Sequence, residues 1–298
     1  MTIRIATAPV CWGIFEFEGA VQRYTPDQVL DQIKEAGYDA LEYGPWGFMP
    51  SDPVVLQAAL DARGLKLLSS FVPVPLVDPA RHDEALANAL KFGRVLAACG
   101  AHHVVLADDS GSVPELVKQA GRRSGSLLDA AAWAIVGEAV NRIAREIHDQ
   151  LGLETVFHHH CAGYVETPEE TARLLDATDP ALVGLCLDTG HYHFAGGDAV
   201  ECIHQHGERV RYLHLKDFDP AVKETCDADE ADYFEAVKRG VFCELGHGAV
   251  DFPGVMKAME ALGYDGWAIV EQDVLVEDID APKQAVARNR QYLRSIGY

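Results

Sequence analysis

The sequence predicts a single (β/α)8 barrel that spans residues 1–298. Eight short apolar segments typical of buried strands alternate with segments of helical periodicity, and no linker or low-complexity stretch interrupts them. Eight strand–helix units in about 250–300 residues match the size of a closed barrel. The main alternative, a doubly wound open sheet, usually carries a glycine-rich phosphate loop after its first strand. This chain has no GxGxxG pattern there.

The predicted strands are runs of β-branched and other apolar residues that end at a glycine, a proline or a polar side chain. The first run ends before Pro9, which cannot donate a hydrogen bond to a sheet. The strands are predicted at Ile3–Ala8, Ala40–Tyr43, Lys66–Val72, His103–Ala107, Leu153–His160, Val183–Asp188, Val210–Lys216 and Trp267–Glu271.

The predicted helices carry apolar residues at helical spacing and, in two cases, clear start signals. Thr25 precedes Pro26 as an N-cap, Gly37 ends that helix, and Thr167 caps a helix that begins at Pro168. The remaining helices are predicted at Pro53–Ala62, His82–Ala98, Leu127–Leu151, Ala199–Gln205, Phe252–Leu262 and Pro282–Ser295.

The composition favours a globular enzyme and argues against two classes of partner. Hydrophobic residues make up 48% of the chain, which is enough for a large core. The net charge of −21 argues against nucleic acid or an anionic membrane as a partner, since both are bound through basic patches. No stretch reaches the roughly 20 apolar residues that span a bilayer.

The cysteines and the N-terminus indicate a cytoplasmic protein. Seven cysteines without tight pairs fit reduced thiols better than a disulfide framework. The N-terminus lacks the basic-then-apolar pattern of a signal peptide. The apolar segment Phe71–Leu76 is consistent with a homodimer surface.

Imidazole and carboxylate side chains gather where four of the predicted strands end. Alternation along a strand determines which side chains share a face. Asp188 is in phase with the small Cys186, which suits a crowded barrel interior. One choice of phase aims His158, Asp188, His214 and Glu271 at the barrel axis from four successive strands, at the end where barrel active sites lie.

Two imidazoles and two carboxylates form a mixed nitrogen and oxygen site for a divalent metal. We expect Mn²⁺ or Co²⁺, with Zn²⁺, Fe²⁺ and Mg²⁺ as alternatives, in preference to Ca²⁺. Each residue also has a purely structural interpretation. Asp188 would serve as the cap of the turn that follows it, and a single histidine at a strand end is more often hydrogen-bonded than a ligand. The prediction depends on the convergence of four strands.

The motifs at these strand ends resemble a known superfamily. FHHH at 157–160, GLCLDTGH at 184–191, YLHLKD at 212–217, ELGHGAVDF at 244–252 and WAIVEQD at 267–273 resemble the sugar isomerase/epimerase superfamily of xylose isomerase-like TIM barrels. Within it, the triple histidine, DTGH and HLKD most resemble inosose dehydratases, which act on 2-keto-myo-inositol.

The resemblance implies a divalent metal at His158, Asp188, His214 and Glu271. Most members have a glutamate at the position of His158, and the ketose epimerases use two metal-bound glutamates to move a proton through an enediol. Because one of that pair is missing, the resemblance favours a dehydratase, a carbon–oxygen lyase that removes water from a small cyclic keto-polyol or keto-sugar. The alternative is a metal-dependent ketose isomerase or epimerase.

A dehydratase needs a base for the acidic C–H beside the ketone and an acid for the departing hydroxyl. The candidate catalytic residues are His160, His191, Lys216 and Glu271, the last as base as well as ligand. We expect Lys216 to stabilise the enolate and a second histidine to protonate the hydroxyl. The residues expected to bind substrate are Trp12, Glu42, Phe71, Asp108 and Glu244.

Two other classes of protein are disfavoured. An apurinic-site endonuclease of the same superfamily would carry more metal-binding residues and a basic rim for DNA, which the charge of −21 opposes. A non-catalytic sugar-binding protein would not need four converging ligands.

Overall fold

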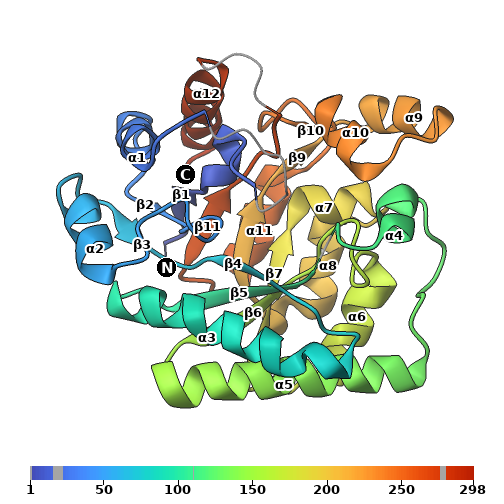
Figure 1. Cartoon of the computed structure of the whole chain (residues 1–298). Coiled ribbons are helices and arrows are strands. Elements are labelled where there is room, and N and C mark those ends of the chain that lie inside the picture. Colours follow the sequence, from blue (N-terminus) through green and yellow to red (C-terminus); the bar gives the residue numbers. More distant parts are fainter. Residues whose placement is uncertain (1, 16–22, 110, 276–279) are drawn as a thin grey trace.

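The computed structural model describes residues 2–15, 23–109, 111–275 and 280–298, and its centre is a curled parallel sheet surrounded by helices (Figure 1). The sheet has nine segments in the order β3-β2-β1-β11-β8-β7-β6-β5-β4. They are β1 Arg4–Thr7, β2 Ala40–Leu41, β3 Lys66–Leu67, β4 Phe71–Val74, β5 His103–Asp108, β6 Glu154–His158, β7 Val183–Asp188, β8 Val210–Leu215 and β11 Trp267–Val270.

The nine segments are the eight predicted barrel strands, because the third strand is broken. The strand predicted at Lys66–Val72 is divided into β3, which pairs with β2, and β4, which pairs with β5. Residues in the break bond to both neighbours: the Tyr43 amide donates to the Ser69 carbonyl at 2.9 Å, and the Val105 amide donates to the Ser70 carbonyl at 3.0 Å. The sheet therefore closes on itself through the break.

The strands alternate between the barrel interior and the surrounding helices, as predicted. An interior cluster of small, branched and aromatic residues contains Ala6, Ala40, Val105, Val156, Cys186, Tyr212 and Ile269. The leucines of β7 and β8, such as Leu213 and Leu215, belong instead to the core between the sheet and the helices. Each predicted metal ligand follows one of the interior residues by two positions and so shares its face.

The outer ring consists of helices with well-defined starts. Both Thr25 and Thr167 form reciprocal capping boxes, which confirms these two start signals. The helix predicted from Leu127 starts at Ala130, because the Asp129 side chain accepts the Ala132 amide. The ring contains α1 Pro26–Glu35, α2 Pro53–Asp61, α3 His82–Ala98, α5 Ala130–Leu151, α6 Pro168–Ala177, α8 Ala199–His206, α11 Phe252–Ala261 and α12 Ala281–Ser295.

Several short elements that we did not predict cover the ends of the barrel strands where the site lies. They are α4 Pro114–Gln119, α7 Thr189–Phe194, α9 Pro220–Ala228, α10 Tyr233–Lys238 and the antiparallel pair of β9 Asp217–Phe218 and β10 Phe242–Cys243. The Asp217 carboxylate holds this region together by accepting the amides of Gly246, Gly248 and Val250. Asp217 therefore supports a loop.

Two properties of the chain as a whole bear on the predictions. All seven cysteines are free thiols, and six of them are buried. Among the described residues, none of the helices combines the length and the apolar character needed to cross a membrane.

Candidate active site

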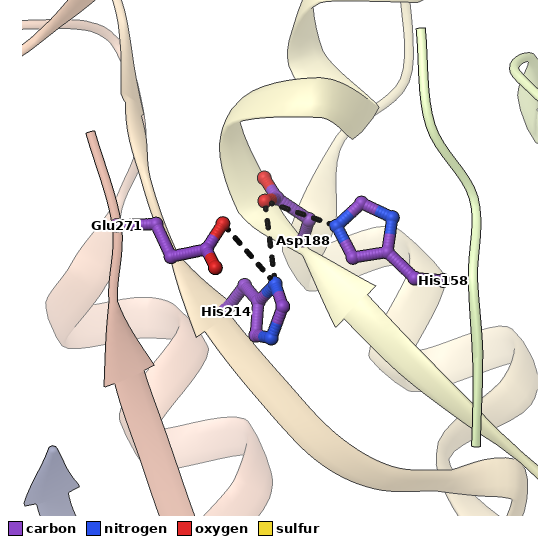
Figure 2. Close-up of side chains that lie close together, drawn as sticks. All are labelled: His158, Asp188, His214 and Glu271. Carbon is purple, nitrogen blue, oxygen red and sulfur yellow. Dashed lines mark ion pairs between the residues drawn. The ribbon is translucent and has the colours of Figure 1, made fainter. Parts of the chain in front are cut away.

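Four side chains from successive strands converge at one end of the barrel (Figure 2). His158 Nε2 lies 3.5 Å from Asp188 Oδ2, and His214 Nδ1 lies 3.8 Å from the same oxygen. His214 Nδ1 also lies 3.3 Å from Glu271 Oε2. One donor atom from each residue fits within a span of 4.8 Å, and all four residues are buried. The structure thus brings together the four predicted ligands.

The chemistry of this cluster fits a divalent cation. Among the described residues, His214 Nδ1 is buried and has no hydrogen-bond partner, which is costly for a polar atom. Within the same part of the chain, Asp188 Oδ2 is also buried without a hydrogen bond, and the Lys216 ammonium lies 3.2 Å from it. Burial acts to raise the pKa of Asp188, but Lys216 and the neighbouring histidines outweigh it and hold that pKa well below its usual range. Similarly, the pKa of Glu271 is lowered to about 2, because His214 and Lys216 outweigh burial. Two charged carboxylates and two inward imidazole nitrogens suit Mn²⁺, Co²⁺, Zn²⁺ or Fe²⁺.

Asp188 performs two functions with its two oxygens. Its Oδ1 accepts the His191 amide at 2.9 Å and caps α7, so the capping role considered from the sequence is real. Its Oδ2 points into the four-residue cluster. The cap fixes the carboxylate orientation, which leaves the second oxygen available to a ligand.

Lys216 lies among three carboxylates beside this cluster. Its Nζ is 2.9 Å from Asp273 Oδ1, 3.1 Å from Glu271 Oε2 and 3.2 Å from Asp188 Oδ2. Burial acts to lower the pKa of Lys216, but these carboxylates outweigh it and raise the pKa well above its usual value. The side chain is therefore a buried ammonium with a fixed position.

A second group of potential ligands, His160, His191 and Asp273, lies next to the first. The Cys161 amide donates to His191 Nδ1 at 3.3 Å, so that nitrogen carries the lone pair. The proton of the neutral ring is then on Nε2, which faces Asp273 Oδ2 at 3.4 Å. Because Nδ1 accepts the amide and the protonated Nε2 faces a carboxylate, His191 directs no lone pair at a metal. The group is a hydrogen-bonded network, and Tyr233 extends it by donating to Asp273 Oδ2 at 3.2 Å.

His160 has the opposite arrangement, with one nitrogen available. Its Nδ1 lies 2.6 Å from the Cys161 carbonyl, which only accepts, so Nδ1 carries the proton and Nε2 the lone pair. Burial, together with the neighbouring His191 and His158, lowers the pKa of His160 well below its usual value. The ring packs against His191 with centroids 4.1 Å apart and the two planes tilted by 39°. His160 is therefore a neutral imidazole whose Nε2 carries a lone pair.

A cavity of about 640 Å³ opens above these groups. Its lining includes the predicted site residues Glu42, Phe71, His158, His160, Lys216 and Glu271. Tyr233 and Asp273, which the sequence analysis did not select, also line it. Asp273 had a signal in the sequence, since it follows Glu271 by two positions in WAIVEQD and so continues the same alternation.

The other predicted site residues are used elsewhere. Trp12 is buried and donates its indole N–H to Gln32 at 2.7 Å. Asp108 Oδ2 accepts the Tyr164 amide at 2.8 Å. Glu244 pairs with Arg288 at 2.6 Å. These three side chains, with the fully buried His191, lie outside the cavity lining formed by the described residues, and we assign them no direct contact with substrate.

Comparison with known proteins places the chain among enzymes. The model of the xylose isomerase-like TIM barrel family matches residues 30–296. The chain belongs to this family. It is 34% identical to an inosose dehydratase of Geobacillus kaustophilus over 91% of this chain and 87% of the relative. The prediction of an enzyme related to inosose dehydratases in a xylose isomerase-like barrel is thus confirmed.

Solved structures of other proteins show the same fold. The probable 3-DHS dehydratase AsbF of Bacillus anthracis superposes with a TM-score of 0.73 at 13% identity, covering 98% of this chain and 99% of that one. The IOLI protein, solved with a bound zinc atom, superposes with a TM-score of 0.68 at 15% identity, covering 99% and 98% of the two chains. At these identities the likeness shows the barrel alone.

Proposed function

We propose that this xylose isomerase-like barrel is a divalent-metal-dependent dehydratase that removes water from a cyclic keto-polyol, such as 2-keto-myo-inositol, or from a related keto-sugar. The inosose dehydratase relative at 34% identity supports the reaction class. The observation that carries the proposal is that a neutral His160 imidazole and a charged Lys216 ammonium line the same cavity. Elimination needs one group that accepts a proton and another that donates one.

The four-residue cluster is the proposed metal site, with Mn²⁺ or Co²⁺ as the working ion. Imidazole and carboxylate donors suit both ions. A divalent ion held by His158, Asp188, His214 and Glu271 would supply Lewis acidity to the oxygens of the substrate. By the family resemblance, most members have a glutamate at the position that His158 occupies in this chain. The His158 imidazole cannot act as the second carboxylate base that such a glutamate provides.

The remaining steps involve side chains of the cavity. His160 Nε2 takes the proton from the carbon beside the ketone, and the C–H electrons shift toward the ketone oxygen to give an enolate. The ketone then re-forms as the enolate electrons move into a new double bond between the α- and β-carbons and the β-hydroxyl departs. Lys216 protonates that hydroxyl, which leaves as water. This assignment gives Lys216 the role first expected of a second histidine, because His191 lies outside the cavity lining formed by the described part of the chain and its Nδ1 already accepts the Cys161 amide. His191, Asp273 and Tyr233 hold His160 and Lys216 in position.

The test is proton NMR of 2-keto-myo-inositol in D₂O with metal-stripped protein, before and after addition of Mn²⁺ or Co²⁺. We expect metal-dependent loss of a hydroxyl-bearing carbon signal and the appearance of a deoxy-diketone. Deuterium beside the ketone with every hydroxyl retained would instead indicate the isomerase or epimerase. Absence of any change in a metal-loaded protein would contradict the proposed substrate.

Variants separate the two proton transfers. His160→Gln should abolish both deuterium exchange beside the ketone and elimination, because the base is lost. Lys216→Met should abolish elimination while deuterium exchange continues, since only the acid is missing. A Lys216 variant that eliminates water at the parent rate would refute the role of Lys216. His148→Gln is the matched control, because His148 is exposed on α5 and faces Asp149 at 3.1 Å.

We expect a cytoplasmic enzyme, in line with seven free thiols, and a small-molecule substrate as its partner.

A further inference from the structure

A carboxylate lies directly behind one of the proposed metal ligands. Glu42, at the end of β2, places its Oε1 3.1 Å from His214 Nε2. The opposite nitrogen of the same ring, Nδ1, faces Glu271 at 3.3 Å and Asp188 at 3.8 Å. Glu42 and His214 are both almost completely buried. The imidazole therefore spans the gap between Glu42 and the four-residue cluster.

The chemistry of the two groups determines where the proton of His214 lies. An ionised carboxylate only accepts hydrogen bonds, so Nε2 must donate to Glu42 and carry the proton. In the neutral ring that would bind a metal, Nδ1 then holds the lone pair and directs it toward Asp188 and Glu271. This nitrogen has no hydrogen-bond partner among the described residues. We propose that Glu42 is a positioning residue that fixes the tautomer and orientation of His214 for metal binding. Glu42 was first predicted to bind substrate.

Glu42 is itself held by a buried pair of hydroxyls. The Ser69 hydroxyl donates to Glu42 Oε1 at 2.8 Å, and the Tyr212 hydroxyl lies 2.6 Å from Ser69 Oγ. Because Ser69 has one hydrogen and gives it to Glu42, Tyr212 is the donor to Ser69. Two sets of donors thus converge on Glu42 Oε1 in the barrel interior: Tyr212 through Ser69 on one side, and His214 on the other.

The fold explains why these hydrogen bonds can form. Ser69 lies in the break between β3 and β4, where the barrel closes and where its carbonyl accepts the Tyr43 amide. Glu42 follows β2, Tyr212 lies in the interior layer of β8, and His214 stands two positions further along the same strand. A carboxylate that holds a ligating histidine in this way raises the basicity of the ligand, and its loss typically costs about 10–100-fold in metal affinity.

The inference rests on the proposed metal site, and metal binding tests it without any substrate. Titration calorimetry with Mn²⁺ should show binding about 10–100-fold weaker in Glu42→Ala than in the parent, and the visible spectrum of the Co²⁺-loaded variant should change. Glu42→Gln keeps an acceptor for Nε2 and should show a smaller loss. This conservative variant preserves the test if Glu42→Ala does not fold.

The matched control is Asp109→Asn, which removes a carboxylate from the same cavity without contact to His214. It should bind Mn²⁺ with nearly the parent affinity and leave the Co²⁺ spectrum unchanged. Equal losses in the Asp109 and Glu42 variants would overturn the inference, because net charge alone would then explain them. Parent affinity in both Glu42 variants would also overturn it.

The outcome is independent of the proposed reaction. A parent protein that binds Mn²⁺ but leaves keto-polyols unchanged, with weaker binding in the Glu42 variants, would refute the reaction and support the inference. If the parent turns over the keto-polyol and the Glu42 variants bind Mn²⁺ with unchanged affinity, the reaction is supported and the inference is refuted. A parent that binds no divalent metal would overturn both.

Discussion

Replacing Lys216 by methionine should destabilise the metal-free protein strongly. Three carboxylate oxygens, from Asp188, Glu271 and Asp273, lie within 3.2 Å of Nζ, and the lysine is 1% exposed. Methionine has nearly the same length but no charge, so the variant leaves these buried carboxylates without their common cation. Removing one partner of a buried ion pair typically costs about 3–5 kcal/mol, and we expect a loss of this size in the free energy of unfolding.

A divalent metal should reduce this loss. An ion in the cluster neutralises Asp188 and Glu271, while Asp273 keeps its contacts with Tyr233 and His191. Urea unfolding in EDTA and in excess Mn²⁺ measures both values. Lys257→Met, on the exposed side of α11, is the matched control and should change stability by no more than about 0.5 kcal/mol. A Lys216 variant within 1 kcal/mol of the parent in EDTA would refute this account of the ion cluster.

Three further predictions concern the metal, a buried ion pair and pH. Mn²⁺ at about 100 times its dissociation constant should stabilise the stripped protein by about 2.7 kcal/mol, seen as a rise in melting temperature of roughly 4 °C. Arg123→Met should cost about 3–5 kcal/mol in urea unfolding, because the buried carboxylates of Glu166 and Glu170 lose their cation; a loss below 1 kcal/mol contradicts this. Burial raises the pKa of Asp108 from 3.8 to about 6, so the folded state holds this proton more tightly and stability falls as the pH rises from 4 through 6. Asp108→Asn should remove up to about 3 kcal/mol of that fall, and an unchanged pH profile of unfolding contradicts the assignment.

The convergence of the ligands could be predicted because it depends on local alternation. A residue that follows an interior position by two shares its face, whatever the rest of the chain does. This rule predicted that Asp188 shares the interior face with Cys186, and that Glu271 shares it with Ile269. In the structure both pairs face the barrel interior. The same rule applies to Asp273, two positions after Glu271. Asp273 was not among the predicted site residues, since the last strand was expected to end at Glu271.

Contacts between distant segments could not be predicted from the sequence. The pairing of Glu244 with Arg288 and the hydrogen bond from Trp12 to Gln32 depend on how the loops and α12 or α1 pack, and no local pattern encodes either contact. The break in the third strand has the same origin, because Ser69 and Ser70 leave regular pairing to bond with both β2 and β5 as the barrel closes. Strand order and phase were therefore predictable, whereas side-chain partners across the barrel were not.

The two carboxylate–histidine pairs of this barrel show why partners determine the role of a histidine. In both pairs a buried carboxylate faces Nε2: Glu42 at His214 and Asp273 at His191. The rings differ at Nδ1, which is unpartnered among the described residues in His214 but accepts the Cys161 amide in His191. One ring is thus prepared to bind a cation and the other is fixed as a support. A sequence that places histidines at neighbouring strand ends cannot separate these cases, because the deciding donor is a backbone amide in a different segment.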